Sequence, residues 1–264
     1  MPIISISRGS YHRGREVAQA VAETLRYECI SRGSLLENSD EFDIPEIKLM
    51  PNVKHAAQVL ERFSFGRERF INYMSSSLLR FLKKDNHVYH GLAGQFFVEG
   101  VRHVIKIRII ADLDERVASE AERKHISKDD ARLQLIQDDE ERRKWAMLLY
   151  GIDISDPSCY DMVLNISTMG VEEAVELIRQ CANFSCYQAT AESTRKIQDL
   201  ALMAEVKAAL FDYPQAGVYV DRGAVRVQVK VPEEQGHIIQ RRMETILQGL
   251  DGIESTEIQV SYYY

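Results

Sequence analysis

Residues 3–25 read IISISRGSYHRGREVAQAVAETL. The run at 3–7 contains three isoleucines and two serines, which predicts a short buried strand. A loop that contains Gly9 and Gly14 follows this run. From residue 17 to residue 25 the apolar side chains recur on one helical face, which predicts an amphipathic helix. The stretch therefore predicts a strand, a glycine-flanked loop and a helix in direct succession.

This order of elements is the setting in which Gly-x-x-x-x-Gly-Lys-Ser/Thr loops bind nucleotide phosphates, through loop amides and the positive end of the helix. Gly9 and Gly14 have the spacing of that pattern, but Arg15 and Glu16 replace its Lys and Ser/Thr. Arg15 can hold a phosphate with a planar guanidinium. Glu16 can hold Mg²⁺ directly or through water, or it can stabilise the first helical turn against the helix dipole. The loop supports phosphate binding better than phosphoryl transfer, and a plain strand-to-helix turn is the alternative.

Length and charge limit the classes of protein that this chain can represent. Its 264 residues are 45% hydrophobic and 28% charged, which is typical of a globular protein with one large core or two smaller ones. The net charge of −7 predicts no nucleic-acid partner, so a site for a polyanion must be local. We expect no transmembrane segment and a cytoplasmic location, because no apolar run approaches about 20 residues and no signal-peptide pattern is present. The four cysteines lack the spacing of a zinc site or of a disulfide framework.

Residues 1–182 alternate between strand-like and helix-like segments. The expected strands are 3–7, 27–30, 88–91, 104–110 and 162–166, and the expected helices between and after them are 54–83, 114–123, 128–150 and 171–182. Short apolar strands separated by helices indicate a parallel sheet covered on both faces. We therefore predict a three-layer α/β domain over residues 1–182.

A different pattern begins after residue 182. Residues 183–196 are polar without a clear period, which predicts a linker. Beyond it, the periodicities predict helices at 197–210 and 234–250 and strands at 217–220, 225–231 and 257–260. The order αββαβ predicts a second, smaller α+β domain over residues 197–264.

Residues 6–18 read ISRGSYHRGREVA and are similar to Ile-Ser-Arg-x-x-Gly-Ser-Gly-Gly-Arg-Glu-Ile-Ala, the opening motif of the cytidylate kinase-like family of P-loop kinases. Further segments that resemble the family follow in order at 104–117, 126–131, 139–145, 150–157 and 160–168. Together they cover most of residues 1–182. The resemblance implies the P-loop fold of the nucleoside monophosphate kinases, with ATP and Mg²⁺ as cofactors and a nucleoside monophosphate such as CMP as acceptor.

The resemblance also implies a set of functional residues. Contacts with the donor phosphates are expected at Gly9, Ser10, His12, Arg13, Gly14, Arg15 and Glu16, with Glu16 also expected to hold Mg²⁺. The expected catalytic residues are Arg15, Arg116 and Arg142, because phosphoryl transfer depends mainly on positioning and on positive charge around the moving phosphate. Asp139 is a substrate contact that the resemblance implies, and Arg67 is a second expected contact because of its own neighbours in the sequence.

Several of these residues have a plainer interpretation. The stretch 138–144 is charged, and pairing of its acidic and basic side chains on a solvated helix face explains such runs without any catalytic role. Arg67 lies among aromatic residues that could hold a base and its phosphate. The same segment is also expected as an amphipathic helix that packs Phe63, Phe70, Ile71 and Met74 into the core.

The chain departs from the family pattern at three positions. Arg15 and Glu16 belong to that pattern, but Tyr11 and Arg13 replace its glycines. Leu92 stands where related kinases tend to carry an arginine near the phosphates. These departures favour a second hypothesis, a nucleotide-responsive regulator that has lost turnover and acts through its C-terminal domain. Both hypotheses remain open.

The C-terminal segments 218–227 (VYVDRGAVRV) and 250–260 (LDGIESTEIQV) resemble a BON domain, a small αββαβ module associated with phospholipid or small-ligand contact. Val229 replaces a later glycine of that module. The resemblance implies a lipid or protein contact through this domain. Self-association of the chain is a further expectation that the sequence leaves open.

Overall fold

The computed structural model describes residues 1–8, 11–37, 65–92 and 94–263, apart from the side chains of residues 11, 12, 36 and 37. These residues divide into two compact units. The first unit lies within residues 1–57 and 84–190, and the second lies within residues 58–83 and 191–264. No helix in the described part of the chain is long and apolar enough to cross a bilayer.

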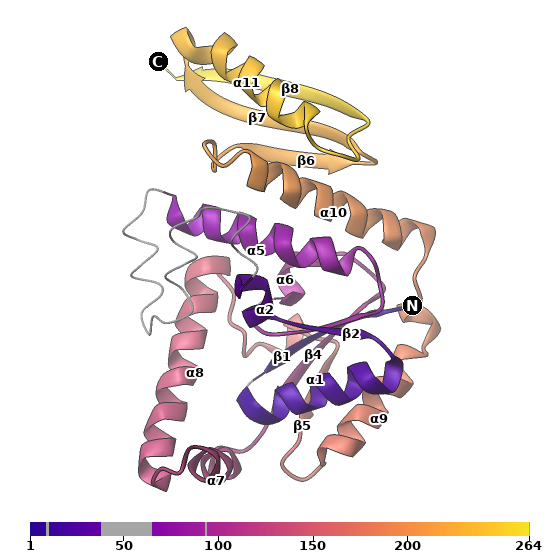
Figure 1. Ribbon diagram of the computed structural model, residues 1–264, viewed down its shortest axis with the longest axis vertical. Helices are drawn as coiled ribbons and strands as arrows, with labels where there is room; N and C mark the ends of the chain where they lie inside the picture. The colour runs from indigo at the N-terminus through magenta and orange to yellow at the C-terminus, as the bar shows by residue number, and fades with distance from the viewer. Residues whose placement is uncertain (9–10, 38–64, 93, 264) are drawn as a thin grey trace. The chain divides into compact units, whose positions relative to one another are not determined.

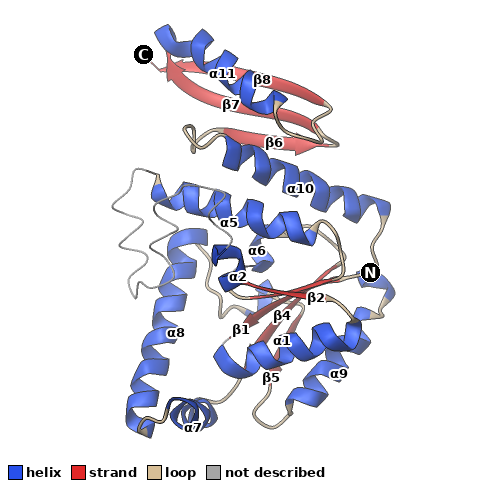
Figure 2. Cartoon of the chain, in the orientation of Figure 1, coloured by secondary structure: helices blue, strands red, loops and turns tan. Residues whose placement is uncertain are grey.

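The first unit is built on a five-stranded parallel sheet that is flanked by helices (Figures 1 and 2). The strand order is β2-β3-β1-β4-β5. Its elements in chain order are β1 (Ile3–Arg8), α1 (Tyr11–Leu25), β2 (Glu28–Ser31), α2 (Arg32–Glu37), β3 (His87–His90), α6 (Gly94–Phe97), β4 (Val104–Ile110), α7 (Leu113–Lys124), α8 (Lys128–Tyr150), a 3₁₀ turn (Pro157–Cys159), β5 (Met162–Asn165), α9 (Val171–Ala182) and a second 3₁₀ turn (Ser185–Tyr187). The predicted parallel α/β fold is thereby confirmed.

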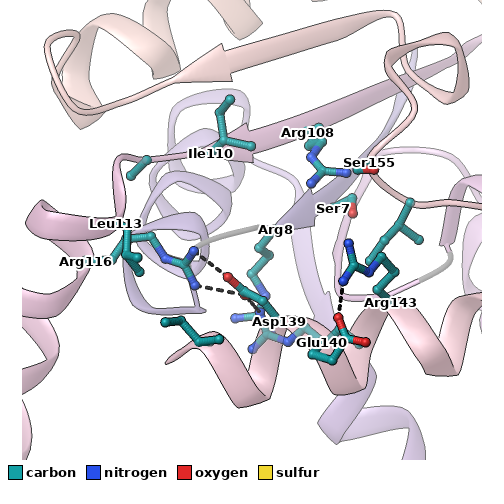
Figure 3. Close-up of a pocket in the computed structure, with 14 residues that line it drawn as sticks. Ser7, Arg8, Arg108, Ile110, Leu113, Arg116, Asp139, Glu140, Arg143 and Ser155 are labelled. Carbon is teal, nitrogen blue, oxygen red and sulfur yellow. Dashed lines mark hydrogen bonds and ion pairs between the residues drawn. The ribbon is translucent and has the colours of Figure 1, made fainter. Parts of the chain in front are cut away.

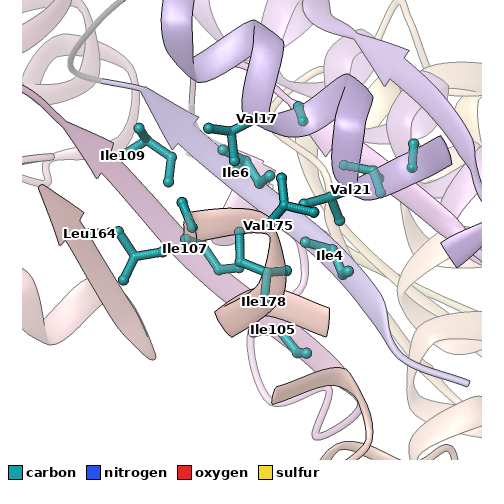
Figure 4. Packing of buried hydrophobic residues seen from close by; sticks show 14 of the residues in the cluster. Ile4, Ile6, Val17, Val21, Ile105, Ile107, Ile109, Leu164, Val175 and Ile178 are labelled. Carbon is teal, nitrogen blue, oxygen red and sulfur yellow. The ribbon is translucent and has the colours of Figure 1, made fainter. Parts of the chain in front are cut away.

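The central strand β1 sends alternate side chains to opposite faces of the sheet. Ile4 and Ile6 lie in the apolar core under α1 and α9 (Figure 4). The same core contains Ile105, Ile107 and Ile109 of β4 and Val17, Val21, Val175 and Ile178 of the two helices. Burial of each such side chain contributes about 1.5–3 kcal/mol. This face of the sheet therefore stabilises the fold and is covered by the two helices.

The opposite face of the sheet carries polar side chains toward the carboxyl end of β1. Ser5 and Ser7 are buried there. Helix α6 packs against this face, where a Cβ on Gly94 would lie 2.3 Å from the Tyr89 ring and 2.9 Å from Ser5 Oγ. Because Gly94 has no side chain, α6 can approach the sheet this closely. The polar end of β1 thus lies between α6 and the elements that follow β4.

Helices α7 and α8 form a hairpin after β4. They share a small core of Val117, Ala121, Ala131 and Leu135. Ser127 begins α8 as an N-cap, with its Oγ accepting a hydrogen bond from the Asp130 N–H at 3.0 Å. The hairpin therefore has its own packing, and it carries charged side chains on α8 past the carboxyl end of the sheet.

The second unit has a mixed three-stranded sheet with the order β6-β7-β8, in which β7 is antiparallel to β6 and parallel to β8. Its elements are α5 (Gly66–Leu82), α10 (Ala191–Ala209), β6 (Gly217–Asp221), β7 (Ala224–Pro232), a 3₁₀ turn (Glu233–Gln235), α11 (Gly236–Gln248) and β8 (Ser255–Tyr263). Inward-facing residues of β7 pack with Leu202 and Val206 of α10 and Met243 of α11. The expected order αββαβ is present from α10 to β8.

The unit boundaries differ from the expected ones in two places. Helix α5 falls within the range 1–182 but belongs to the second unit, where it packs against α10. Phe70 and Met74 of α5 are buried as expected, whereas Phe63 lies outside the described residues. Helix α10 begins at Ala191, inside the predicted linker, and buries Ser193 and Ile197. Tertiary packing thus extends this helix into a stretch whose polarity predicts a linker.

Candidate functional site

A cavity of about 630 Å³ lies in the first unit at the carboxyl ends of β1 and β4 (Figure 3). Its lining residues are Ser7, Arg8, Arg108, Ile110, Ala111, Leu113, Arg116, Ile136, Asp139, Glu140, Arg142, Arg143, Ile154 and Ser155. Five of these residues are arginines and two are acidic, so the formal charge around the cavity is positive. In open α/β sheets, ligands bind outside the carboxyl ends of the strands. The cavity is therefore the candidate site, and an anionic ligand fits its charge.

Three of the residues expected from the sequence meet in this cavity. Arg116 of α7 binds Asp139 of α8 with both amino groups, at 2.6 Å from Nη1 to Oδ2 and 2.9 Å from Nη2 to Oδ1. Nη1 of Arg142 lies 4.0 Å from Oδ1 of the same carboxylate. The side chain of Arg116 is only 10% exposed. The Arg116–Asp139 pair joins two helices, so pairing along one solvated helix face does not account for Arg116.

The cavity also contains three arginines that are not among the expected catalytic residues. Arg8 ends β1, Arg108 lies within β4, and Arg143 on α8 forms an ion pair with Glu140. That ion pair holds the pKa of the Glu140 carboxyl below its ordinary value, chiefly through the hydrogen bond from Arg143. One signal in the sequence points to Arg108, because a charged residue interrupts the apolar run of β4. Its position on the cavity side follows only from the strand pairing.

Helix α1 begins earlier than the spacing of Gly9 and Gly14 predicts. Helix α1 begins at Tyr11, so Gly14 lies in the first turns of the helix and not at the end of a loop. A Cβ on Gly14 would lie 2.9 Å from the Cβ of Arg8. Gly14 thus leaves room for the Arg8 side chain, and a glycine inside a helix costs only about 1 kcal/mol relative to alanine. Gly9 and Ser10 lie outside the described residues, as does the side chain of His12.

The remaining expected residues do not line the cavity. Arg13 forms an ion pair with Glu115 of α7, and its Nη1 donates a hydrogen bond to the Ile166 carbonyl oxygen at 3.4 Å. Arg15 and Glu16 are exposed on α1, and Arg67 is exposed on α5 of the second unit. Among the described residues, no group of three or more His, Cys, Asp or Glu side chains is arranged to hold a metal ion. A role for Glu16 in holding Mg²⁺ therefore stays a prediction.

The carboxyl end of the neighbouring strand β3 also lies in a positive environment. The pKa of the buried His90 is lowered to about 4, chiefly because burial disfavours the charged imidazolium, and further because Arg8 and Arg15 are close. Folded protein therefore keeps His90 neutral at neutral pH. The two arginines act at the same edge of the sheet where an anion would bind.

The lowered pKa of His90 predicts how stability depends on pH. The contribution of His90 to the free energy of unfolding is fully present above pH 6.5, the ordinary value, and is lost progressively as the pH falls toward about 4. Over this range the unfolded chain takes up a proton that the folded chain does not. His90→Gln should flatten this part of the profile in urea unfolding at a series of pH values. The same change at the exposed His237 is the control, and equal profiles for the two variants would contradict the prediction.

Comparison with known proteins finds a matching family model and several relatives of this chain. Residues 3–168, more than half of the chain, match the sequence model of the Cytidylate kinase-like family. The cytidylate kinase of Sulfolobus acidocaldarius is 38% identical over 74 residues, which cover 28% of this chain and 41% of that protein. The cytidylate kinase of Staphylothermus marinus is 34% identical over 97 residues, which cover 37% of this chain and 54% of that protein. The chain thus spans about half the length of the curated relatives that it matches.

A solved structure shows the same fold. An uncharacterized protein from Eubacterium ventriosum superposes with a TM-score of 0.54 at 17% identity, over 69% of this chain and 98% of that one. At this identity the likeness concerns the fold alone. Together with the family match over residues 3–168, the parallel sheet and the cavity at its carboxyl edge lead to one conclusion. The chain belongs to the cytidylate kinase-like family.

Proposed function

We propose that the protein binds ATP with Mg²⁺ and transfers the terminal phosphoryl group to a nucleoside monophosphate. The cavity with its five arginines carries this proposal, because it lies at the carboxyl edge of the sheet in a chain of this family. In the reaction, the bond between the γ-phosphorus and the β,γ-bridging oxygen breaks, and its electron pair stays on ADP. A phosphate oxygen of the acceptor forms the new bond, which gives a nucleoside diphosphate.

The arginines of the helical hairpin are proposed to stabilise the moving phosphoryl group. Transfer of this group requires alignment and positive charge around its oxygens, and little covalent chemistry from the protein. Arg116 and Arg142 come from two different helices and converge on Asp139. A phosphate bound in the cavity would compete with this carboxylate for their N–H groups. Asp139 would then orient the arginines, or it would contact the acceptor as expected from the sequence.

The first turn of α1 is proposed to hold the donor phosphates. The first four N–H groups of a helix have no acceptor within the helix, and the helix dipole adds positive charge there. Arg15 and Glu16 on α1 are proposed to contribute a charge and an Mg²⁺ ligand. Mg²⁺, when bound, would neutralise charge on the donor phosphates, commonly through one or two carboxylates and the phosphate oxygens.

For the second unit we propose a BON-like module, supported by the order α10-β6-β7-α11-β8. Tyr262 and Tyr263 at the end of β8 are 41% and 50% exposed, and they offer a surface for a lipid or protein contact or for self-association. Sedimentation of the chain with and without anionic phospholipid vesicles tests the lipid contact and self-association. Cosedimentation with the vesicles supports a lipid contact, and a concentration-dependent sedimentation coefficient supports self-association.

The proposed function is tested by a coupled assay that detects ADP, with ATP, Mg²⁺ and each common nucleoside monophosphate as acceptor. We expect turnover with at least one pyrimidine or purine monophosphate, and CMP is the first acceptor to test. The reaction should stop when Mg²⁺ is chelated. Binding of ATP without turnover on any acceptor would reject the kinase proposal and favour the regulator hypothesis.

A further inference from the structure

Arg108 occupies a position in β4 that directs its side chain toward the cavity. The neighbouring residues Ile107 and Ile109 enter the core under α1 and α9, so Arg108 lies on the opposite face of the sheet. Its register partner on β1 is Ser7, which also lines the cavity (Figure 3). A charged side chain is therefore held at the wall of the cavity by the central strand β1 and its neighbour β4.

Arg108 is also incompletely satisfied. Its Nη1 atom is buried and has no hydrogen-bond acceptor among the described residues. Arg116 also has one buried nitrogen without an acceptor, Nε, but its two amino groups are bound to Asp139, and Arg143 is bound to Glu140, whereas no ion pair holds Arg108 in the part of the chain that the structure describes. A buried donor without an acceptor is costly and uncommon in folded proteins. An anion that enters the cavity and accepts a hydrogen bond from this atom would remove the cost.

The surroundings of Arg108 hold its guanidinium in place. The group lies 5.7 Å from the centre of the Tyr160 ring, within the range of a cation–π contact. Tyr160 is itself fixed, since its hydroxyl donates a hydrogen bond to the Ile154 carbonyl oxygen at 2.9 Å and accepts one from Gln95 Nε2 at 3.1 Å. The guanidinium therefore has a rigid aromatic support, and ordering it for a ligand costs little.

We propose that Arg108 binds the phosphate of the acceptor nucleotide, an inference that rests on the proposed function. The assignment to the acceptor follows from the sheet, because Arg108 lies on the face opposite α1, whose first turn is the proposed site of the donor phosphates. Arginine suits this task because its planar fork binds a phosphate with two parallel hydrogen bonds. Arg108 then supplies a guanidinium at the edge of the sheet where the sequence has Leu92 and not an arginine.

Steady-state kinetics of the full chain tests the assignment. Arg108→Gln should raise KM for the acceptor by about tenfold to a hundredfold, as loss of a hydrogen bond to a charged group predicts. KM for ATP should change by less than about twofold, and Arg108→Lys should restore part of the loss. Lys106→Gln is the matched control, because Lys106 lies two residues earlier on the same face of β4 and does not line the cavity. An unchanged KM for the acceptor, or an equal rise in KM for ATP, would overturn the proposal.

Calorimetric titration separates this inference from the proposed function. The wild-type chain should bind CMP more tightly than cytidine, which lacks the phosphate, and Arg108→Gln should remove that difference while Lys106→Gln keeps it. This result without any turnover would reject the kinase proposal and keep the role of Arg108. If the wild-type chain shows turnover and Arg108→Gln still binds CMP more tightly than cytidine, the kinase proposal stands and the role of Arg108 is rejected. The inference is wrong if the wild-type chain binds a nucleoside monophosphate no more tightly than the corresponding nucleoside. The monophosphate tested is CMP, or the acceptor that the coupled assay identifies. Circular dichroism of each variant verifies that it is folded.

Discussion

Arg116→Ala is expected to lower kcat/KM for phosphoryl transfer by about two to three orders of magnitude. Arg116 lies at the wall of the cavity with a side chain that is only 10% exposed, and both of its amino groups are directed at Asp139. Little water is available to replace its charge beside the negatively charged phosphoryl oxygens while the electron pair of the broken bond moves onto ADP. The effect should appear mainly in kcat in a coupled assay, because the interaction is proposed to be strongest in the transition state.

Two further variants distinguish a loss of charge in the cavity from a general disturbance of the helical hairpin. Arg132→Ala removes an arginine of α8 that pairs with Asp114 outside the cavity, and it should leave kcat within about twofold. Arg116→Lys keeps the charge but cannot bind Asp139 with two parallel hydrogen bonds, so it should recover only part of the activity. Equal losses in Arg116→Ala and Arg132→Ala would show that the hairpin matters for folding and that Arg116 has no special role.

Val227→Asp is expected to unfold the second unit and leave the first unit folded. Val227 lies in the central strand β7 of the mixed sheet, and its side chain is fully buried. An unpaired carboxylate at this position should cost more than about 4 kcal/mol, which is a large part of the stability of a small domain. Hydrogen exchange read by mass spectrometry should show loss of protection in β6, β7, β8 and α10. Protection of β1 and β4 and the fluorescence of Trp145, the single tryptophan, should persist.

The neighbouring position provides the control for this substitution. Gln228 follows Val227 on β7 but faces solvent, where its amide bonds Gln259 of β8 at 2.8 Å. Gln228→Asp introduces the same charge on the exposed face and should cost less than about 1 kcal/mol. Uniform loss of protection through the whole chain of Val227→Asp would contradict the division into two units. The same experiment shows whether α5, which packs with the second unit, loses its protection together with β7.

Elements with strong local signals could be predicted from the sequence almost to the residue. Helix α8 spans 128–150 as expected, because Ser127 caps its first turn and Gly151, at φ 67°, ends it in a conformation that glycine favours. The strand 104–110 is likewise β4. The helix expected from residue 17 begins at Tyr11 in the structure, because Gly14 in the sequence resembles the end of a loop. What keeps a glycine within this helix is the side chain of Arg8, which local periodicity does not reveal.

The sequence by itself determined the alternation of strands and helices, the family and the presence of Arg116, Asp139 and Arg142 in the segments that resemble it. Each of these signals is contained in a short window of the chain. Only the tertiary structure decided that α5 packs with the second unit and that Arg108 reaches the cavity. The physical reason is that the cavity forms where β1, β4, α7 and α8 converge. Which side chains meet there depends on strand register and helix packing between residues more than 100 positions apart.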